Sequence, residues 1–280
     1  MGKADLHTHT TASDGAYSPK ELLKYAKKKG LETISITDHD TIKGYLNAVD
    51  IAEELGIELI SGIENTVIWK GKEVHLLAYG FDVNNDAILS LIHKQRNARK
   101  NRMVSIVTQL QKQGLAIDID EVKAEARAGN IGRPHAAEVL KNKGYVTTVN
   151  EAFIRYLSFE KLNEVKTDYA GIEEVIDIFK KGGGVLSLAH PGPLYSSKEV
   201  EELVSLGIDG IECIHPSHSF SVQRVYTAKA ESDNLLITGG SDFHGKGTSD
   251  YDPYFGIVTL GNQHVASLKR MIRRRVEFSS

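Results

Sequence analysis

Two short motifs pair metal-binding side chains at a spacing of two residues. His7 and His9 lie in the segment DLHTH (residues 5–9), and Asp242 and His244 lie in SDFH (residues 241–244). Residues i and i+2 of an extended strand point to the same side, so each pair can present both side chains to one ion. Neutral imidazole together with carboxylate suits Zn²⁺, Mn²⁺ or Fe²⁺. One such pair alone is common in proteins without a metal.

Four further side chains of the same chemistry follow other predicted strands. They are His39 in TDHD (residues 37–40), Glu64 in SGIE (residues 61–64), His75 and His190. Each also has a simpler interpretation, such as a helix cap, a surface pair or a loop residue. However, six separate strands each supply a metal-type ligand, and independent chance explains that poorly. In α/β barrels the chemistry lies at the carboxyl ends of the strands, so the sequence predicts a cluster of divalent ions there.

The elements that must position these side chains alternate between strand and helix. Apolar runs predict strands, and segments such as SPKE (residues 18–21), which has the features of a capping box with proline at the first helical position, predict helix starts. This alternation indicates a parallel sheet wrapped by helices, with about seven βα units. The strands that we expect cover residues 3–8, 33–36, 57–60, 74–79, 184–189, 210–214, 235–238 and 256–260. We expect one helix over residues 41–55 and a C-terminal helix from residue 265.

Residues 86–166 break the alternation. Apolar residues at helical spacing between Ile88 and Leu110 predict a long amphipathic helix that ends at Gly114, and shorter helical segments follow it. We therefore predict an α/β fold in which residues 1–85 and 167–280 form a (β/α)7 barrel. Residues 86–166 form a helical insertion over the barrel mouth.

Composition limits the classes of partner. The chain has 280 residues and a formal net charge of −3, so no overall basic field attracts it to nucleic acid or membrane. No apolar run approaches the ~20 residues of a membrane span, and the N-terminus lacks the apolar region of a signal peptide. The single cysteine, Cys213, lies in a predicted buried strand and cannot form an internal disulfide. We expect a cytoplasmic protein with no membrane partner and no evident protein partner.

The motifs together resemble those of the PHP (polymerase and histidinol phosphatase) domain family. The matching segments are DLHTHT (5–10), SDG (13–15), TDHD (37–40), GIE (62–64), His75, HPG (190–192) and SDFH (241–244), in the order that the family keeps. The resemblance covers the chain from end to end and implies a distorted β/α barrel with two or three metal ions. It is most similar to the group that acts on 3′,5′-nucleoside bisphosphates, AMP-like compounds or the 5′ ends of short RNAs. That group also carries a helical insertion after its fourth strand.

The resemblance also implies how the ligands are shared among three ions. His7, His9, Glu64 and Asp242 hold the first ion; Glu64, His75 and His190 hold the second, with Glu64 bridging; Asp14, His39 and His244 hold the third. His135, in GRPH (residues 132–135), competes with His190 for its place. Mn²⁺ is the ion that we expect first, with Zn²⁺ or Fe²⁺ as alternatives.

Several residues outside the ligand set are candidates for handling the substrate. Arg133 can offer a planar fork to a phosphate, although a surface arginine near a helix cap is the simpler alternative. His135 lies beside it, and His215 and His218 follow a predicted strand, where they are candidate phosphate ligands or proton donors. Supporting a metal ligand, or a plain loop position, is an equal alternative for His215 and His218. Lys94, Arg96, Arg99, Lys100 and Arg102 form either a solvated helix face or a contact for a second phosphate or RNA backbone.

We therefore predict a metal-dependent phosphoesterase that hydrolyses nucleotide phosphate monoesters, or short 5′-phosphorylated RNA, by attack of a metal-bridging hydroxide on phosphorus. Glu64, His190, Arg133 and His218 are the predicted catalytic residues. Histidinol phosphatase is one alternative, but members resembling that enzyme usually have a histidine where this chain has Asp14. A C–N bond hydrolase and a non-catalytic nucleotide-binding module are two others. The helical insertion and Arg133 favour a phosphate substrate over a C–N bond, and the complete ligand set opposes a non-catalytic module.

Overall fold

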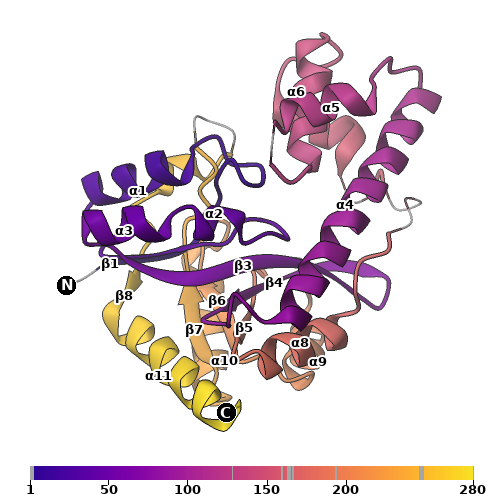
Figure 1. Cartoon of the computed structure of the whole chain (residues 1–280). Coiled ribbons are helices and arrows are strands. Elements are labelled where there is room, and N and C mark those ends of the chain that lie inside the picture. The colour runs from indigo at the N-terminus through magenta and orange to yellow at the C-terminus, as the bar shows by residue number, and fades with distance from the viewer. Residues whose placement is uncertain are drawn as a thin grey trace.

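A nearly closed barrel of eight strands forms the centre of the molecule (Figure 1). The computed structural model describes residues 3–127, 129–158, 160–162, 165, 167–192, 194–245 and 249–279. The strand order is β7-β6-β5-β4-β3-β2-β1-β8. The strands are β1 (Lys3–Thr8), β2 (Thr33–Ile36), β3 (Glu58–Trp69), β4 (Lys72–Tyr79), β5 (Val185–Leu188), β6 (Gly210–Ile214), β7 (Leu236–Gly239) and β8 (Leu260–Gly261). The predicted α/β barrel is confirmed.

The barrel closes between β1 and the segment that follows β7. The Asp242 N–H donates to the carbonyl of His7, and the His9 N–H donates to the carbonyl of Phe243, both at 2.9 Å. A side chain at position 240 would collide with the His7 backbone, so only glycine permits this approach. The closure places the two predicted ligand pairs side by side.

The sequence prediction was wrong about β3 and β4. They form an antiparallel hairpin in which Trp69 pairs with Lys72, and β4 is also antiparallel to β5. The hairpin turn is Lys70-Gly71, and both residues have positive φ (48° and 78°), as a two-residue type I′ turn requires. Parallel strands need a long crossover, which two residues cannot supply. Glu64 therefore lies within a long strand and not at the end of a short one.

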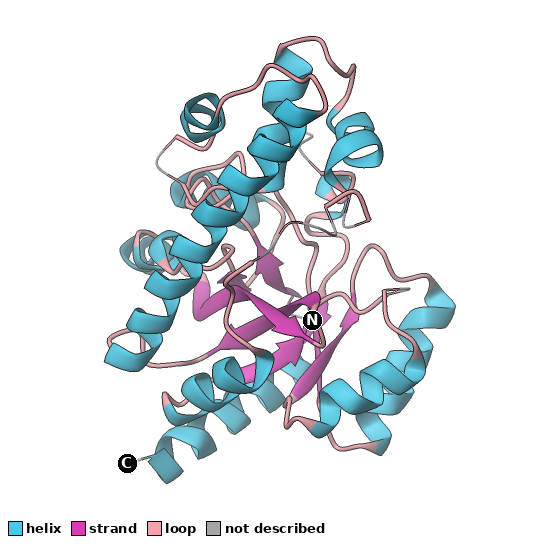
Figure 2. Ribbon diagram, turned by 90° about the vertical axis from the view of Figure 1, so that its right-hand side faces the viewer, coloured by secondary structure: helices cyan, strands magenta, loops and turns pink. Residues whose placement is uncertain are grey.

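Other differences are smaller. The helix predicted over residues 41–55 is divided into α2 (Lys43–Leu46) and α3 (Val49–Leu55). The last predicted strand is reduced to β8, which pairs antiparallel with the start of β1. The helix α1 (Pro19–Lys28) begins as predicted, with Ser18 and Glu21 forming the capping box. The remaining barrel helices are α8 (Ile172–Lys181), α9 (Ser197–Ser205), α10 (Phe220–Ser232) and α11 (Asn262–Ser279), and helices surround the strands in Figure 2.

Between β4 and β5 the chain forms a largely helical segment. It contains α4 (Asp86–Lys112), α5 (Ile119–Glu125), α6 (Arg133–Asn142), α7 (Val149–Ala152) and a π-helical turn, η1 (Phe153–Leu157). The first turns of α4 pack on the barrel core, whereas its second half packs with α5 and α6 in a separate hydrophobic cluster. Figure 1 shows α5 and α6 standing away from the barrel at the far end of α4. The exact boundaries of the insertion stay a prediction, and Lys166 lies outside the described residues.

Two further observations concern the whole chain. Among the described residues, no helix is both long enough and apolar enough to cross a membrane. Cys213 is fully buried in β6, and burial raises the pKa of its thiol to about 12, as expected for a packed and unreactive cysteine.

Candidate metal centre and substrate cavity

The first predicted ligand set converges on one point at the barrel mouth. Glu64 Oε2 lies 3.3 Å from Nε2 of both His7 and His9, and Asp242 Oδ1 lies 3.4 and 3.1 Å from the same two nitrogens. Ligand atoms that share one ion at ~2.1 Å lie roughly 3 to 3.4 Å apart. The spacing of these four side chains therefore fits a single divalent ion.

The second set uses the other oxygen of the same carboxylate. Glu64 Oε1 lies 2.8 Å from His75 Nδ1 and 3.0 Å from His190 Nε2. Glu64 comes from the middle of β3, His75 from the adjacent strand β4, and His190 from the loop after β5. The two oxygens of this one carboxylate thus face two different ligand sets, Oε2 the first and Oε1 the second. A ligand that bridges two ions needs this arrangement.

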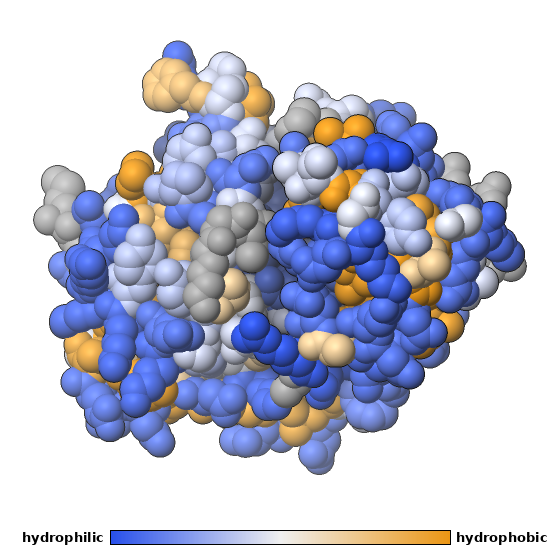
Figure 3. Space-filling view, turned by 90° about the horizontal axis from the view of Figure 1, so that it is seen from above, coloured by the Kyte–Doolittle hydropathy of each residue, from blue (hydrophilic) through white to orange (hydrophobic). Residues whose placement is uncertain are grey.

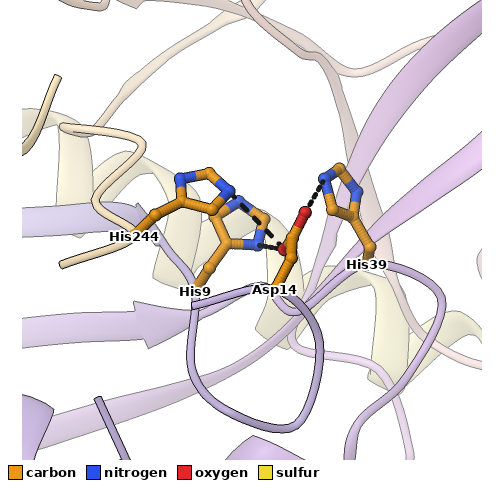
Figure 4. Close-up of side chains that lie close together, drawn as sticks. All are labelled: His9, Asp14, His39 and His244. Atoms are coloured by element: carbon orange, nitrogen blue, oxygen red, sulfur yellow. Dashed lines mark ion pairs between the residues drawn. The ribbon is translucent and has the colours of Figure 1, made fainter. Parts of the chain in front are cut away.

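The third set surrounds Asp14, in the loop after β1 (Figure 4). Its carboxylate oxygens lie 3.7 Å from His39 Nε2 and 3.5 Å from His244 Nε2. The Nδ1 of His244 faces the carbonyl of Asp242 at 2.9 Å, which leaves Nε2 to point at Asp14. His9 also lies near this group, with Nδ1 3.8 Å from Asp14.

Unsatisfied polar atoms show that these residues fit metal ions. Buried polar atoms normally have hydrogen-bond partners, because an unpaired one costs about 1–3 kcal/mol. Half of the twelve buried side-chain atoms without such partners among the described residues belong to the three sets. They are His7 Nε2, both ring nitrogens of His9, Asp14 Oδ1, His39 Nδ1 and Glu64 Oε2. Divalent ions bound between these side chains would give most of these atoms a partner.

The charges of the site are strongly coupled. Burial opposes ionisation of Glu64, but the imidazoles of His39, His75 and His7 outweigh it and hold the pKa of Glu64 well below its usual range. Burial likewise opposes ionisation of Asp242, whose pKa is also held well below its usual range, chiefly by His7. Both carboxylates are therefore ionised and available to bind cations.

Two buried acids that the sequence analysis missed hold the ligands in place. Glu212 Oε1 lies 2.9 Å from His7 Nδ1, and Glu212 Oε2 accepts the backbone N–H of His190 at 2.7 Å. Carboxylates often bind the outer nitrogen of a metal-ligating histidine in this way. Asp5 accepts hydrogen bonds from both the N–H and the hydroxyl of Ser241, beside Asp242. A charged residue inside the otherwise apolar strand 210–214 was the available signal for Glu212.

The residues that flank His39 do not contact its ring. Asp38 accepts hydrogen bonds from Thr10 and Ser13, and so holds the loop that carries Asp14. Asp40 pairs with Arg99. Both carboxylates therefore fix the chain around His39.

Three predicted substrate ligands lie apart from the cavity or are already engaged. The ring of His218 faces the carbonyl of Cys213 through Nδ1 and accepts the Gly192 N–H through Nε2, so both nitrogens are occupied by backbone. Burial also lowers the pKa of His218, as suits a neutral ring. His135 Nδ1 accepts the N–H of Gly132 at the start of α6, whereas His190 Nε2 lies 3.0 Å from Glu64.

His215 is the third of these residues. It is 1% exposed, and its Nε2 lies 3.5 Å from Asp242 Oδ2. The ring of Tyr251, which lines the cavity, stands edge-on to His215 at 5.1 Å. This geometry favours a role in orienting Asp242 over direct contact with a substrate.

A cavity of about 480 Å³ opens in front of the ligand sets. Its lining includes His39, His75, Asp242 and His244, together with Arg99, Arg102 and Arg133. Arg99 and Arg102 are buried on α4, so this part of the predicted basic run is not a solvated face. Seen from above, this side of the molecule is mostly hydrophilic (Figure 3). The cavity therefore has room for a small molecule between metal-type ligands and guanidinium groups.

Comparison with known proteins agrees with this site. Residues 5–188 match the model of the PHP domain. The chain belongs to the PHP domain family. It is 35% identical to a 5′-3′ exoribonuclease of Haemophilus influenzae, covering 86% of this chain and 90% of the relative. It is 30% identical to a phosphoribosyl 1,2-cyclic phosphate 1,2-diphosphodiesterase of Eggerthella lenta (86% and 94% covered) and 29% identical to a 3′,5′-nucleoside bisphosphate phosphatase of Chromobacterium violaceum (90% of each).

A solved structure supports the same assignment. The crystal structure of a putative metal-dependent phosphoesterase from Bifidobacterium adolescentis superposes with a TM-score of 0.86 at 33% identity, covering 96% of each chain. This PHP domain protein is therefore a metal-dependent phosphoesterase, a hydrolase whose His, Asp and Glu clusters are able to bind metal.

Proposed function

We propose that the chain binds three divalent ions, with Mn²⁺ preferred, and hydrolyses phosphate monoesters of nucleotides. The observation that carries the proposal is the placement of Glu64, whose two oxygens face different imidazoles beside a cavity that Arg102 and Arg133 line. The ligand sets are those that the sequence predicted, with His190 and not His135 completing the second. Zn²⁺ and Fe²⁺ suit the same donors.

The chain's own residues fit a phosphate ester in this cavity. Bound ions would supply Lewis acidity and a water of lowered pKa. Asp14, Glu64 and Asp242 contribute only three negative charges to the three sets, so a filled centre keeps a positive surplus that attracts phosphate. Arg133 lines the same cavity, where its guanidinium group can bind a phosphate oxygen.

A nucleotide is the substrate class that we favour. The relatives named above act on RNA, on a ribose phosphate and on a nucleoside bisphosphate, which share a phosphorylated ribose. Phe153 and Tyr251 also line the cavity and offer aromatic surface beside the arginines. A nucleoside with a second phosphate can use both the metal-type ligands and the guanidinium groups. Short 5′-phosphorylated RNA presents the same groups.

A small substrate panel tests the proposal. Phosphate release is measured with Mn²⁺-loaded protein on adenosine 3′,5′-bisphosphate, AMP, histidinol phosphate and a short 5′-phosphorylated RNA. We expect kcat/KM for the bisphosphate or the RNA to exceed that for histidinol phosphate by about 100-fold, because the smaller substrate has no second phosphate to bind the cavity arginines. A Glu64→Gln preparation made in parallel excludes contaminating phosphatases.

Two results would overturn the proposal. Preferred turnover of histidinol phosphate would assign the chain to that alternative. Absence of phosphate release from every member, with the metal content confirmed, would contradict a nucleotide phosphatase.

A further inference from the structure

Glu73, on β4, lies between the second ligand set and the cavity arginines. Its Oε2 contacts Arg102 Nη2 at 2.7 Å, while its Oε1 lies 3.5 Å from His75 Nε2 and 3.8 Å from Arg133 Nη2. Its side chain is 8% exposed and lines the cavity. One carboxylate therefore contacts a candidate metal ligand and two candidate substrate ligands.

Local structure fixes this placement. Glu73 and His75 are two residues apart on one strand, so their side chains share a face. The tight Lys70-Gly71 turn holds β4 in register against β3, which carries Glu64. Because His75 Nδ1 faces Glu64, its Nε2 is left to donate to Glu73. Carboxylate partners of this kind set both the tautomer and the orientation of a metal-ligating histidine.

The arginines need the same carboxylate. Burial and the nearby charges of Arg102 and Arg99 together lower the pKa of Arg133 to about 10, although the carboxylate of Glu73 opposes the change. Arg99 is held separately, by Asp40 and Thr66. Glu73 forms ion pairs with both Arg102 and Arg133, and its negative charge offsets the repulsion between these two buried guanidinium groups.

We propose that Glu73 is a positioning residue that links His75 to Arg102 and Arg133, so that ion binding at the second set and phosphate binding in the cavity strengthen each other. The proposal rests on the proposed function, because it takes the arginines as phosphate ligands. Such coupling is reciprocal by thermodynamic necessity: whatever factor the ion adds to phosphate affinity, phosphate adds to ion affinity.

The test compares wild-type protein with Glu73→Gln in three calorimetric titrations. Mn²⁺ is titrated into metal-depleted protein, and inorganic phosphate is titrated into both the metal-depleted and the Mn²⁺-loaded forms. We expect Glu73→Gln to weaken one Mn²⁺ site by about 10- to 100-fold, the usual effect of losing an outer partner of a ligating histidine. We also expect phosphate affinity to fall about tenfold, because Arg102 and Arg133 lose the carboxylate that holds their guanidinium groups in place, and its enhancement by Mn²⁺ to shrink.

The control is Glu174→Gln, which makes the same chemical change in an exposed carboxylate paired with Lys94. It should leave all three titrations unchanged. Wild-type Mn²⁺ and phosphate affinities in a folded Glu73→Gln protein would overturn the proposal. Should that variant not fold, Glu73→Asp keeps the charge on a shorter side chain. Its losses should be smaller and in the same direction, and unchanged affinities would again overturn the proposal.

The outcome is separable from that of the proposed function. If the substrate panel fails but Glu73→Gln still weakens a Mn²⁺ site and phosphate binding, the nucleotide assignment is wrong and the link through Glu73 stands. If the panel succeeds but Glu73→Gln leaves the titrations unchanged, the nucleotide assignment stands and the link through Glu73 is wrong.

Discussion

Replacing Glu64 by Gln is expected to lower kcat/KM by about 10³-fold or more, which corresponds to about 4 kcal/mol of lost transition-state stabilisation. The reason is that Glu64 is shared: its Oε2 contacts His7, His9 and His39, and its Oε1 contacts His75 and His190. A neutral amide keeps the shape but loses the charge and one acceptor oxygen. Steady-state kinetics on the best substrate and the metal content of the purified variant together test this expectation.

A matched control lies on the same strand. Glu58 begins β3, is partly exposed and pairs with Lys269 and Thr33, away from the cavity. Glu58→Gln should keep near wild-type activity and metal content. If Glu64→Gln retained most of its turnover while folded, the assignment of Glu64 as a shared ligand would be wrong.

Removal of the ions is expected to abolish phosphate release and to lower the melting temperature. A ligand that binds only the folded state stabilises it by RT ln(1 + [L]/Kd), which is about 4 kcal/mol for one ion present at a thousand times its Kd. At roughly 2 °C per kcal/mol for a chain of this size, Tm should fall by about 8 °C for each tightly bound ion lost. The buried atoms that have no hydrogen-bond partner, such as His9 Nε2 and Glu64 Oε2, explain the sensitivity.

Thermal unfolding is recorded before chelation, after chelation and after Mn²⁺ is restored. Activity and Tm should return together. In Glu64→Gln the return of Tm should be much smaller, because its ligand sets are incomplete. Full activity in protein whose metal content has fallen to near zero would refute metal dependence.

The ligand pairs were predictable because their signal is local. The spacing of His7 with His9 and of Asp242 with His244 follows from strand geometry, and the capping box at Ser18 follows from short-range hydrogen bonding. The α/β alternation likewise predicted a barrel, which the structure confirms. These features need no knowledge of what lies elsewhere in the chain.

What the sequence analysis missed depends on contacts between distant segments. The Lys70-Gly71 turn was overlooked, so β3 was cut short and the β3–β4 pairing was misjudged. Glu212 lies far along the chain from His7, and Glu73 meets Arg102 only once α4 has folded back over β4. His218 was taken as a substrate ligand because of its position after β6, but its ring is used by the backbone of two loops.

X-ray diffraction near the manganese absorption edge, from crystals grown with Mn²⁺, is the most direct test that these side chains form the metal centre. The account predicts three anomalous peaks: one among His7, His9, Glu64 and Asp242, one among Glu64, His75 and His190, and one among Asp14, His39 and His244. A crystal of active protein with no peak at the first of these positions, or with its manganese bound elsewhere, would contradict the account.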